Sequence, residues 1–235
     1  MVVGYDATTS SEEALRWAAD EAGQRDVHLR IMSCFDMPTA ADAVVGFGYA
    51  EAILLIERTT ERRLEPVVAA MEATHPTLSI TTMVAPGPAW EVLCSRLDPG
   101  DLVVVGIERR RHRGPFRLGS TVRHLVRHSD CPVVVVHGPT SRGRPDRVVV
   151  GVDGPRAAGD ALEWARAESE RWSVELVVMS TWTSNDLLGA VRDGDLVVVG
   201  SHHRRGITRA VDAPAVEDLL ERAAVPVVVV PVSGA

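Results

Sequence analysis

An interrupted internal repeat constrains the fold of this chain more than any other feature. The segment VVGYD at 2–6 returns as VVGVD at 149–153, with an offset of 147. The segment DLVVVG at 101–106 returns unchanged at 195–200, with an offset of only 94, so about 53 residues are absent from the second copy. Both flanks of the gap stay in register, which indicates that the missing piece is one the fold can lose.

Apolar runs alternate with amphipathic helical patterns throughout the first copy. Ser10 and Ser11 are placed to cap the first helix, whose apolar face contains Ala14, Leu15 and Trp17. Alternating strands and helices predict an α/β fold with a doubly wound parallel sheet, and strand 3 is expected at its edge. The expected order is 3-2-1-4-5, from strands near residues 2–6, 27–34, 78–84, 102–105 and 133–136.

The longest helical pattern covers residues 49–74. Pro66 is expected either to kink this helix or to mark a first turn after a break. Glutamate and arginine recur at helical spacing, which predicts surface ion pairs among Glu57, Arg58, Glu61 and Arg62. A short helix is expected from Pro88, and a last one from about Gly119 to His128.

The gap in the repeat falls on helix 2 and strand 3. The second copy keeps strand 1, helix 1, strand 2, a shortened helix, strand 4, the last helix and strand 5, so the order 2-1-4-5 is expected. We predict two domains of this Rossmann-like type, at residues 1–139 and 147–235, joined by a linker at 140–146 that is rich in Ser, Gly, Pro and Arg.

Composition excludes several classes of function. The net charge of −7 leaves no electrostatic footprint for general nucleic-acid binding, and no apolar run approaches the ~20 residues of a membrane span. All basic residues are arginine, which excludes a P-loop lysine and a Schiff-base lysine. Cys34, Cys94 and Cys131 are isolated in the sequence; they form no metal-binding pattern, and they suit a reducing cytoplasm.

The strongest candidate site lies where the strand order reverses, between strands 1 and 4. Asp6 ends strand 1 and Gly106 ends strand 4, and such positions bind ligands in open α/β sheets. Gly119-Ser120 opens the last helix of the copy, where backbone N–H groups, a hydroxyl and the positive helix end favour an anion. Five arginines in the preceding loop, residues 107–118, strengthen that positive field.

A spaced motif accompanies this site: Gly106, two residues, Arg109, nine residues, then Gly119-Ser120. With the opening VGYD, the GPA at 87–89 and the CPVVVV at 131–136, the chain resembles tandem universal stress proteins of the UspA type over nearly all its length. The resemblance implies ATP or a related adenine nucleotide, with Mg²⁺ only where ATP is bound. It implies a site formed by Asp6, Cys34, Val105, Gly106, Gly119, Ser120 and Thr121.

Within that site, the resemblance places the adenosine end at Asp6 and the backbone near Cys34. Val105 and Gly106 line the pocket, and the phosphates lie at Gly119, Ser120 and Thr121. Arg109 stands where the family has its second glycine, and either pairs with phosphate or fills the pocket.

The second copy lacks the phosphate-binding pattern. It has Ala213-Pro214 in place of Gly119-Ser120, and proline has no N–H to donate. His203 replaces the second motif glycine, and Asp212 adds a negative charge. We therefore expect a degenerate second site.

The sequence thus predicts a cytoplasmic regulatory protein that binds adenine nucleotide in its first domain as a stress-response switch. No catalytic residue and no metal ligand are assigned. The alternatives are a nucleotide-free interaction or dimerisation module of the same fold and, less favoured, a slow ATPase. The resemblance also implies an intramolecular pseudo-dimer in which the two valine-rich last strands meet. It leaves room for a homodimer of the whole chain, and predicts no nucleic-acid or membrane partner.

Overall fold

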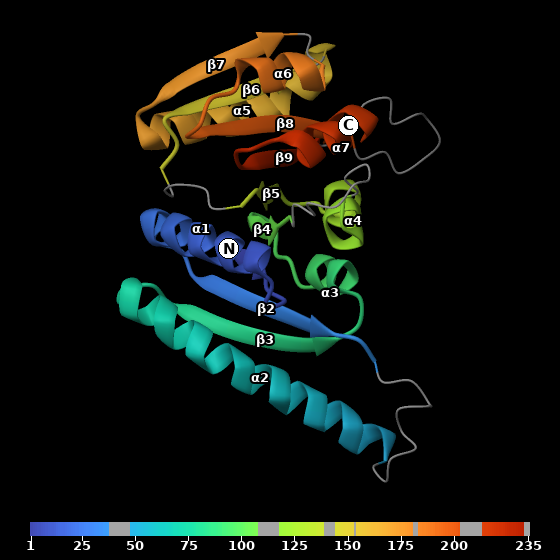
Figure 1. Cartoon of the computed structure of the whole chain (residues 1–235). Helices are drawn as coiled ribbons and strands as arrows, with labels where there is room; N and C mark the ends of the chain where they lie inside the picture. Colours follow the sequence, from blue (N-terminus) through green and yellow to red (C-terminus); the bar gives the residue numbers. More distant parts are fainter. Residues whose placement is uncertain are drawn as a thin grey trace.

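A computed structural model describes residues 1–37, 48–107, 118–138, 144–152, 154–180, 183–202 and 213–232 (Figure 1). The first copy contains β1 (Val2–Gly4), α1 (Thr9–Arg25), β2 (Leu29–Phe35), α2 (Tyr49–Thr74), β3 (Ile80–Pro86), α3 (Ala89–Ser95), β4 (Val103–Gly106), α4 (Ser120–His128) and β5 (Val133–Val136). The second copy contains β6 (Arg147–Val152), α5 (Gly154–Trp172), β7 (Glu175–Ser180), α6 (Ser184–Ala190), β8 (Asp195–His202), α7 (Ala213–Arg222) and β9 (Val227–Val232). No helix within the described ranges has the length and apolarity that crossing a membrane requires.

All the described strands join in one sheet with the order β3-β2-β1-β4-β5-β9-β8-β6-β7. The first copy therefore has the expected order 3-2-1-4-5, and the second has 2-1-4-5 in equivalent strands. Pairing is parallel within each copy and antiparallel between β5 and β9, where Val134 faces Val228. The two last strands meet as the resemblance implied, and neither is left as an open edge.

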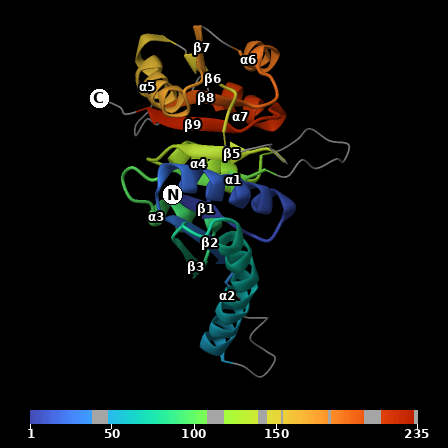
Figure 2. The ribbon, with the colours of Figure 1, turned by 90° about the vertical axis from the view of Figure 1, so that its left-hand side faces the viewer.

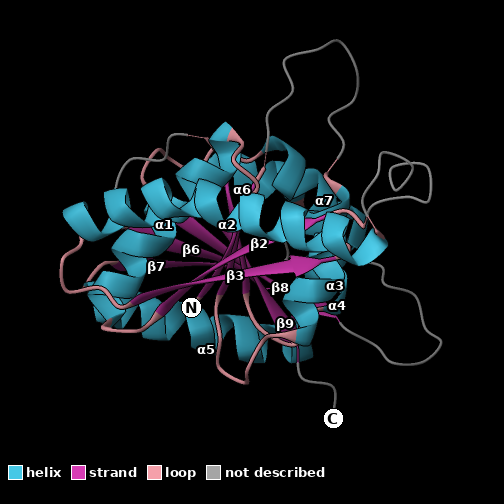
Figure 3. Cartoon of the chain, turned by 90° about the horizontal axis from the view of Figure 1, so that it is seen from below, coloured by secondary structure: helices cyan, strands magenta, loops and turns pink. Residues whose placement is uncertain are grey.

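Helices cover both faces of this sheet (Figure 3). Successive strand residues point to opposite faces, so Val103 and Val104 belong to different core clusters. On one face the strands pack against α1, α2 and α5; on the other they pack against α3, α4, α6 and α7. Strands buried on both faces explain the unbroken runs of valine.

A charged cluster joins α1 to α5 where the two copies meet. Arg25 contacts both Glu21 and Glu168, with Nε 2.7 Å from Glu21 Oε1, and Arg171 also contacts both carboxylates. The glutamate side chains are only 2% and 5% exposed, whereas the arginines are 23% and 25% exposed. Glu21 and Glu168 occupy equivalent positions of the repeat, at the offset of 147.

The deleted segment leaves a partly uncovered strand in the second copy. Ile31 of β2 is fully buried, but its equivalent, Val178 of β7, is 47% exposed because no further strand or helix of the described residues covers this edge. The retained helix α6 has the same seven-residue length as α3, so the expectation of a shortened helix is wrong. The deletion removed helix 2 and strand 3 as whole elements.

Two further local expectations are wrong, and a third is wrong in one of its two alternatives. Thr8, rather than Ser10 or Ser11, caps α1, because its side chain accepts a hydrogen bond from Ser11 N–H. Helix α2 continues through Pro66, so of the two alternatives for this proline a break with a new first turn is wrong, and a kink stays a prediction; Pro66 is exposed, so the carbonyl that it leaves unbonded can reach water. The ion pairs expected along α2 do not form among the described residues.

Candidate functional site

The strand register brings three of the predicted residues to one edge of the sheet. In the pairing of β1 with β2, Gly4 faces Met32, so Asp6 and Cys34 lie at the same level just beyond it. On the other side of β1, Val3 faces Val104, which places Gly106 beside the end of β1. The carboxyl ends of β2, β1 and β4 therefore form a common edge, as ligand binding at a strand-order switch requires.

Asp6 is exposed at this edge, and its carboxylate is used locally. Thr8 donates two hydrogen bonds to Asp6 Oδ1, from its N–H at 3.1 Å and from its hydroxyl at 2.5 Å. Asp6 N–H in turn donates to Ser11 Oγ at 3.3 Å. These bonds fix the turn from β1 into α1, where Ala7 has a positive φ of 61°. Asp6 therefore has a structural role at the start of α1.

Gly106 has a packing reason to be glycine. A Cβ at this position would lie 2.1 Å from the carbonyl oxygen of Ser10 and 2.9 Å from the nitrogen of Ser11. Both contacts are with backbone, so no side-chain rotation relieves them. The first turn of α1 can cross the end of β4 only because residue 106 has no side chain. This explanation holds whether or not a nucleotide binds.

The start of α4 has the features of an anion site. Gly119 is the N-cap and provides no side-chain cap, and the first intrahelical bond runs from Arg123 N–H to Gly119 C=O at 3.1 Å. The N–H groups of residues 120–122 precede that bond, so the helix itself provides no acceptor for them. Ser120 is exposed and Thr121 is half-exposed. The positive end of the helix thus lies at the surface at Ser120 and Thr121, with N–H groups that the helix leaves unbonded, and it fits a phosphate.

A carboxylate from the second copy reaches the approach to α4. Leu118 N–H donates to Glu221 Oε1 at 3.0 Å, and Glu221 belongs to α7. Glu217 of α7 forms an ion pair with Arg127 and lies 3.6 Å from Arg123 Nε. Sequence reasoning missed Glu221. The repeat could have indicated it: the offset of 94 makes Glu217 and Glu221 the equivalents of Arg123 and Arg127, so acidic residues of one copy match basic residues of the other.

Val105 and the cysteines are buried to different extents. Val105 is 4% exposed and belongs to the core that packs under α4. Cys34 is half-buried at the end of β2, and burial raises the pKa of its thiol to about 11. Burial also raises the pKa of the Cys94 and Cys131 thiols. All three thiols are therefore protonated at neutral pH, which argues against nucleophilic chemistry at any of them.

Arg109, the departure from the family motif, lies outside the described residues, as do Asp153, His203 and Asp212 of the second copy. The described residues contain no group of three or more His, Cys, Asp or Glu side chains that could hold a metal ion.

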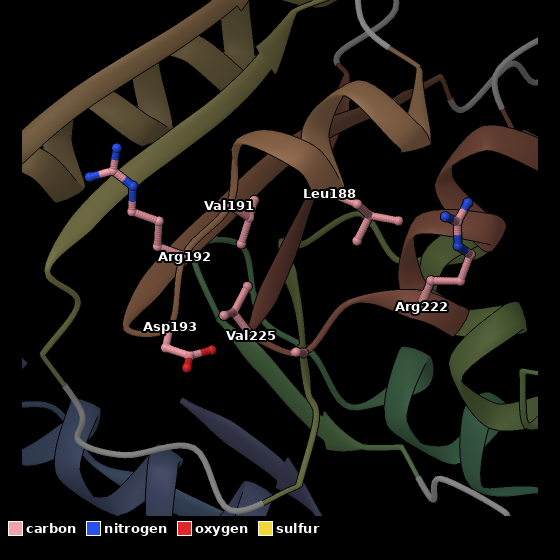
Figure 4. A pocket seen from close by; sticks show the side chains of 7 residues that line it. Leu188, Val191, Arg192, Asp193, Arg222 and Val225 are labelled. Atoms are coloured by element: carbon pink, nitrogen blue, oxygen red, sulfur yellow. The ribbon is translucent and has the colours of Figure 1, made fainter.

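A pocket of about 270 Å³ lies elsewhere in the second copy (Figure 4). Leu188, Val191 and Val225 form its apolar part, and Arg192 and Arg222 lie at its sides. Its residues come from the carboxyl-terminal parts of α6 and α7 and from the loops that lead from them into β8 and β9, so it lies at the amino ends of these strands. The predicted nucleotide site is at the carboxyl ends of the first-copy strands, and this pocket is not part of it.

Comparisons with known proteins agree on one family. The model of the universal stress protein family matches residues 1–137 and 189–231. A universal stress protein of Mycolicibacterium smegmatis is 29% identical over 188 residues, which cover 77% of this chain and 63% of the relative. One of Mycobacterium tuberculosis is 31% identical over 197 residues, which cover 80% of this chain and 65% of the relative. The chain thus spans less than two thirds of the length of these relatives.

The fold agrees with this match. The crystal structure of a universal stress protein from Archaeoglobus fulgidus superposes with a TM-score of 0.75 at 15% identity, and the alignment covers 99% of this chain and 98% of that one. At this identity the likeness concerns the fold alone. The family match supports a role in the stress response, and the chain belongs to the universal stress protein family.

Proposed function

We propose that this protein is a cytoplasmic stress-response regulator that binds ATP or a related adenine nucleotide in its first copy. The start of α4 carries the proposal, because Gly119 and Ser120 present backbone N–H groups and a helix end without a side-chain cap. The phosphates would bind there, beside the edge formed by Asp6 and Gly106. Bound Mg²⁺ would enter only with ATP.

Contacts between the copies offer a route from occupancy to regulation. A phosphate at the start of α4 would come close to the carboxylate of Glu221, which accepts from Leu118 N–H at 3.0 Å. Two anions at one helix end repel each other, so nucleotide binding and the contact of Glu221 with Leu118 oppose each other. By linkage, whatever loosens this contact raises nucleotide affinity, and nucleotide loosens the contact.

In the described part of the chain, the first copy has this arrangement and the second does not. In the second copy α7 begins at Ala213, and Pro214 occupies the position of Ser120. Proline is well accommodated in a first helical turn but donates no hydrogen bond. One nucleotide per chain is therefore expected, with the second copy as the structural partner of the first.

A nucleotide-free interaction module is the alternative. It is favoured by the engagement of Asp6 with Thr8 and by the position of Glu221, since each already uses a group that a nucleotide would need. Slow ATP hydrolysis is the least favoured function, because the carboxylate of Asp6, which would have to act on the attacking water, is already held by two hydrogen bonds from Thr8.

Transplanting the second-copy sequence into the first tests the proposal. Gly119→Ala with Ser120→Pro should leave α4 intact, because a Cβ on Gly119 meets nothing within 4 Å and its φ of −57° and ψ of 150° suit a residue before proline. The variant loses one N–H and the hydroxyl, so we expect calorimetric ATP binding to weaken at least about tenfold.

Asp153→Ala, in the second copy, is the matched control and should bind ATP as the parent chain does. Mass spectrometry of nucleotide released from the denatured parent protein provides an independent measurement. A parent chain that releases no nucleotide and shows no binding at millimolar ATP would rule out the nucleotide proposal in favour of the interaction module.

A further inference from the structure

Helix α2 is longer than the sheet that it covers. Its 26 residues span about 39 Å, whereas the seven residues of the adjacent strand β3 span about 23 Å. The difference, about 16 Å, corresponds to three helical turns. Figures 1 and 2 both show the amino-terminal part of α2 extending away from the sheet. The residues that α2 contributes to the core, Leu64, Val67, Val68 and Met71, all belong to its carboxyl-terminal half.

The extended part presents an exposed stripe of four residues, Glu51, Leu54, Leu55 and Arg58, which we call the outer stripe. The last three follow Glu51 by three, four and seven residues, a spacing that places all four on one side of the helix. This side lies about 130° around the helix axis from Leu64, which faces the core. Leu54 is 50% exposed and Leu55 is 56% exposed, and both are among the most exposed large apolar side chains of the described residues.

The outer stripe is complementary to itself. Reversing its direction about a point between Leu54 and Leu55 exchanges the two leucines and places Glu51 opposite Arg58. Among the described residues, neither charge is used in an ion pair within the chain. Glu51 also accepts a hydrogen bond from Gly48 N–H at 3.0 Å, which holds its carboxylate on the helix surface. A surface that matches itself under reversal is what a two-fold dimer requires.

We propose that the outer stripe binds the outer stripe of a second copy of this chain, with the two α2 helices antiparallel about a two-fold axis. Leu54 of each copy packs against Leu55 of the other, and Glu51 pairs with Arg58 at both ends. The sheet edges of β5 and β9 are already joined within the chain, so they offer no edge for an intermolecular partner. This contact does not depend on nucleotide binding.

The contact buries a small area, because only three turns of each helix take part. Interfaces below about 1,200 Å² are typical of weak, reversible association. The dimer is therefore expected to form with increasing concentration from the micromolar range upward. Sedimentation velocity of the full chain over that range is the primary measurement.

Charge reversal provides the decisive test. Glu51→Arg places two arginines opposite each other, and Arg58→Glu does the same with two glutamates, so each variant alone should dimerise at least about tenfold more weakly than the parent. An equimolar mixture of the two variants restores attraction at both ends, so it should form a mixed dimer. Leu54→Ser with Leu55→Ser should abolish association with every partner.

Two features of the design separate docking from damage to the helix. Glu51→Arg also removes the bond to Gly48, but a helix weakened for that reason would not be rescued by mixing with Arg58→Glu. Arg63→Glu makes the same charge change about 140° around the helix, and it should dimerise as the parent does. A parent chain that stays monomeric, single variants that associate normally, or a mixture that fails to recover would each overturn the proposal.

Discussion

Removing an arginine from the α1–α5 charged cluster should destabilise the fold far more than removing a glutamate. The cluster holds two arginines and two glutamates, and the glutamates are the buried members, at 2% and 5% side-chain exposure. Arg25→Met keeps most of the side-chain volume but leaves Glu21 and Glu168 with only Arg171. Two carboxylates, neither of which can reach water, then share one positive charge.

The expected loss in the free energy of unfolding follows from this difference in burial between the glutamates and the arginines. Leaving a buried charge without its partner costs about 3–5 kcal/mol, and Arg171 still contacts both carboxylates, so we expect about 3 kcal/mol for Arg25→Met. Glu21→Gln instead leaves an excess positive charge on arginines that are 23% and 25% exposed and can be hydrated. Its cost should stay below about 1 kcal/mol.

Acidification should reduce the cost of Arg25→Met. Burial raises the pKa of Glu21, and Arg25 and Arg171 oppose this shift, so removing Arg25 raises that pKa further. The folded variant then binds more protons than the unfolded chain between the two pKa values. Its free energy of unfolding falls as pH rises through that window, and is recovered below it.

Urea unfolding of the parent and of each variant at about pH 5 and about pH 8 measures both effects. The double variant Arg25→Met with Glu168→Gln restores equal numbers of positive and negative charges, so it should be more stable than Arg25→Met alone. The reasoning is refuted if Glu21→Gln costs as much as Arg25→Met, or if the cost of Arg25→Met grows on acidification.

Three further predictions concern the candidate site. Gly106→Ala should cost more than about 2 kcal/mol, because its Cβ would lie 2.1 Å from Ser10 O; an unchanged melting temperature would contradict this. Alkylation of Cys34 in the folded protein, followed by mass spectrometry, should be slow at neutral pH and rise toward its pKa of about 11; rapid labelling at neutral pH would show that the thiol is not shielded. Glu221→Gln removes the carboxylate charge at Leu118 N–H, and should raise calorimetric ATP affinity about threefold or more; equal or weaker binding would count against the linkage between Glu221 and the nucleotide.

The sheet could be predicted from the sequence because burial determines both the residue types of the strands and their positions in the sheet. Valine runs mark strands covered on two faces, and the repeat with its gap identifies strand 3 as the one that can be lost. The observed order agrees with this, and α2 has the bounds 49–74 that were expected. The domain boundaries at 139 and 147 stay a prediction, since one continuous sheet crosses from the first copy to the second.

The site was harder to predict because its contacts join distant segments. Asp6 and Gly106 were assigned to a nucleotide on motif grounds, but Asp6 binds Thr8 and Gly106 allows the close approach of Ser10. Glycine spacing cannot distinguish a ligand requirement from a packing requirement, since both demand the absence of a side chain. Glu221 was missed because it lies 103 positions from Leu118 in the sequence.

Charges at equivalent positions explain why the two copies pair with each other within one chain. On the α4–α7 side, Arg123 and Arg127 of the first copy correspond to Glu217 and Glu221 of the second. Two first copies from different chains, paired in the same way, would place arginine against arginine, whereas the intramolecular pairing joins Arg127 to Glu217. The charge difference thus selects the partner, and the same change brings Glu221 to the approach of α4. In the proposed nucleotide site, a substitution that favours internal pairing therefore also opposes an anion at the start of α4, and we predict that nucleotide affinity depends on how tightly the copies are joined.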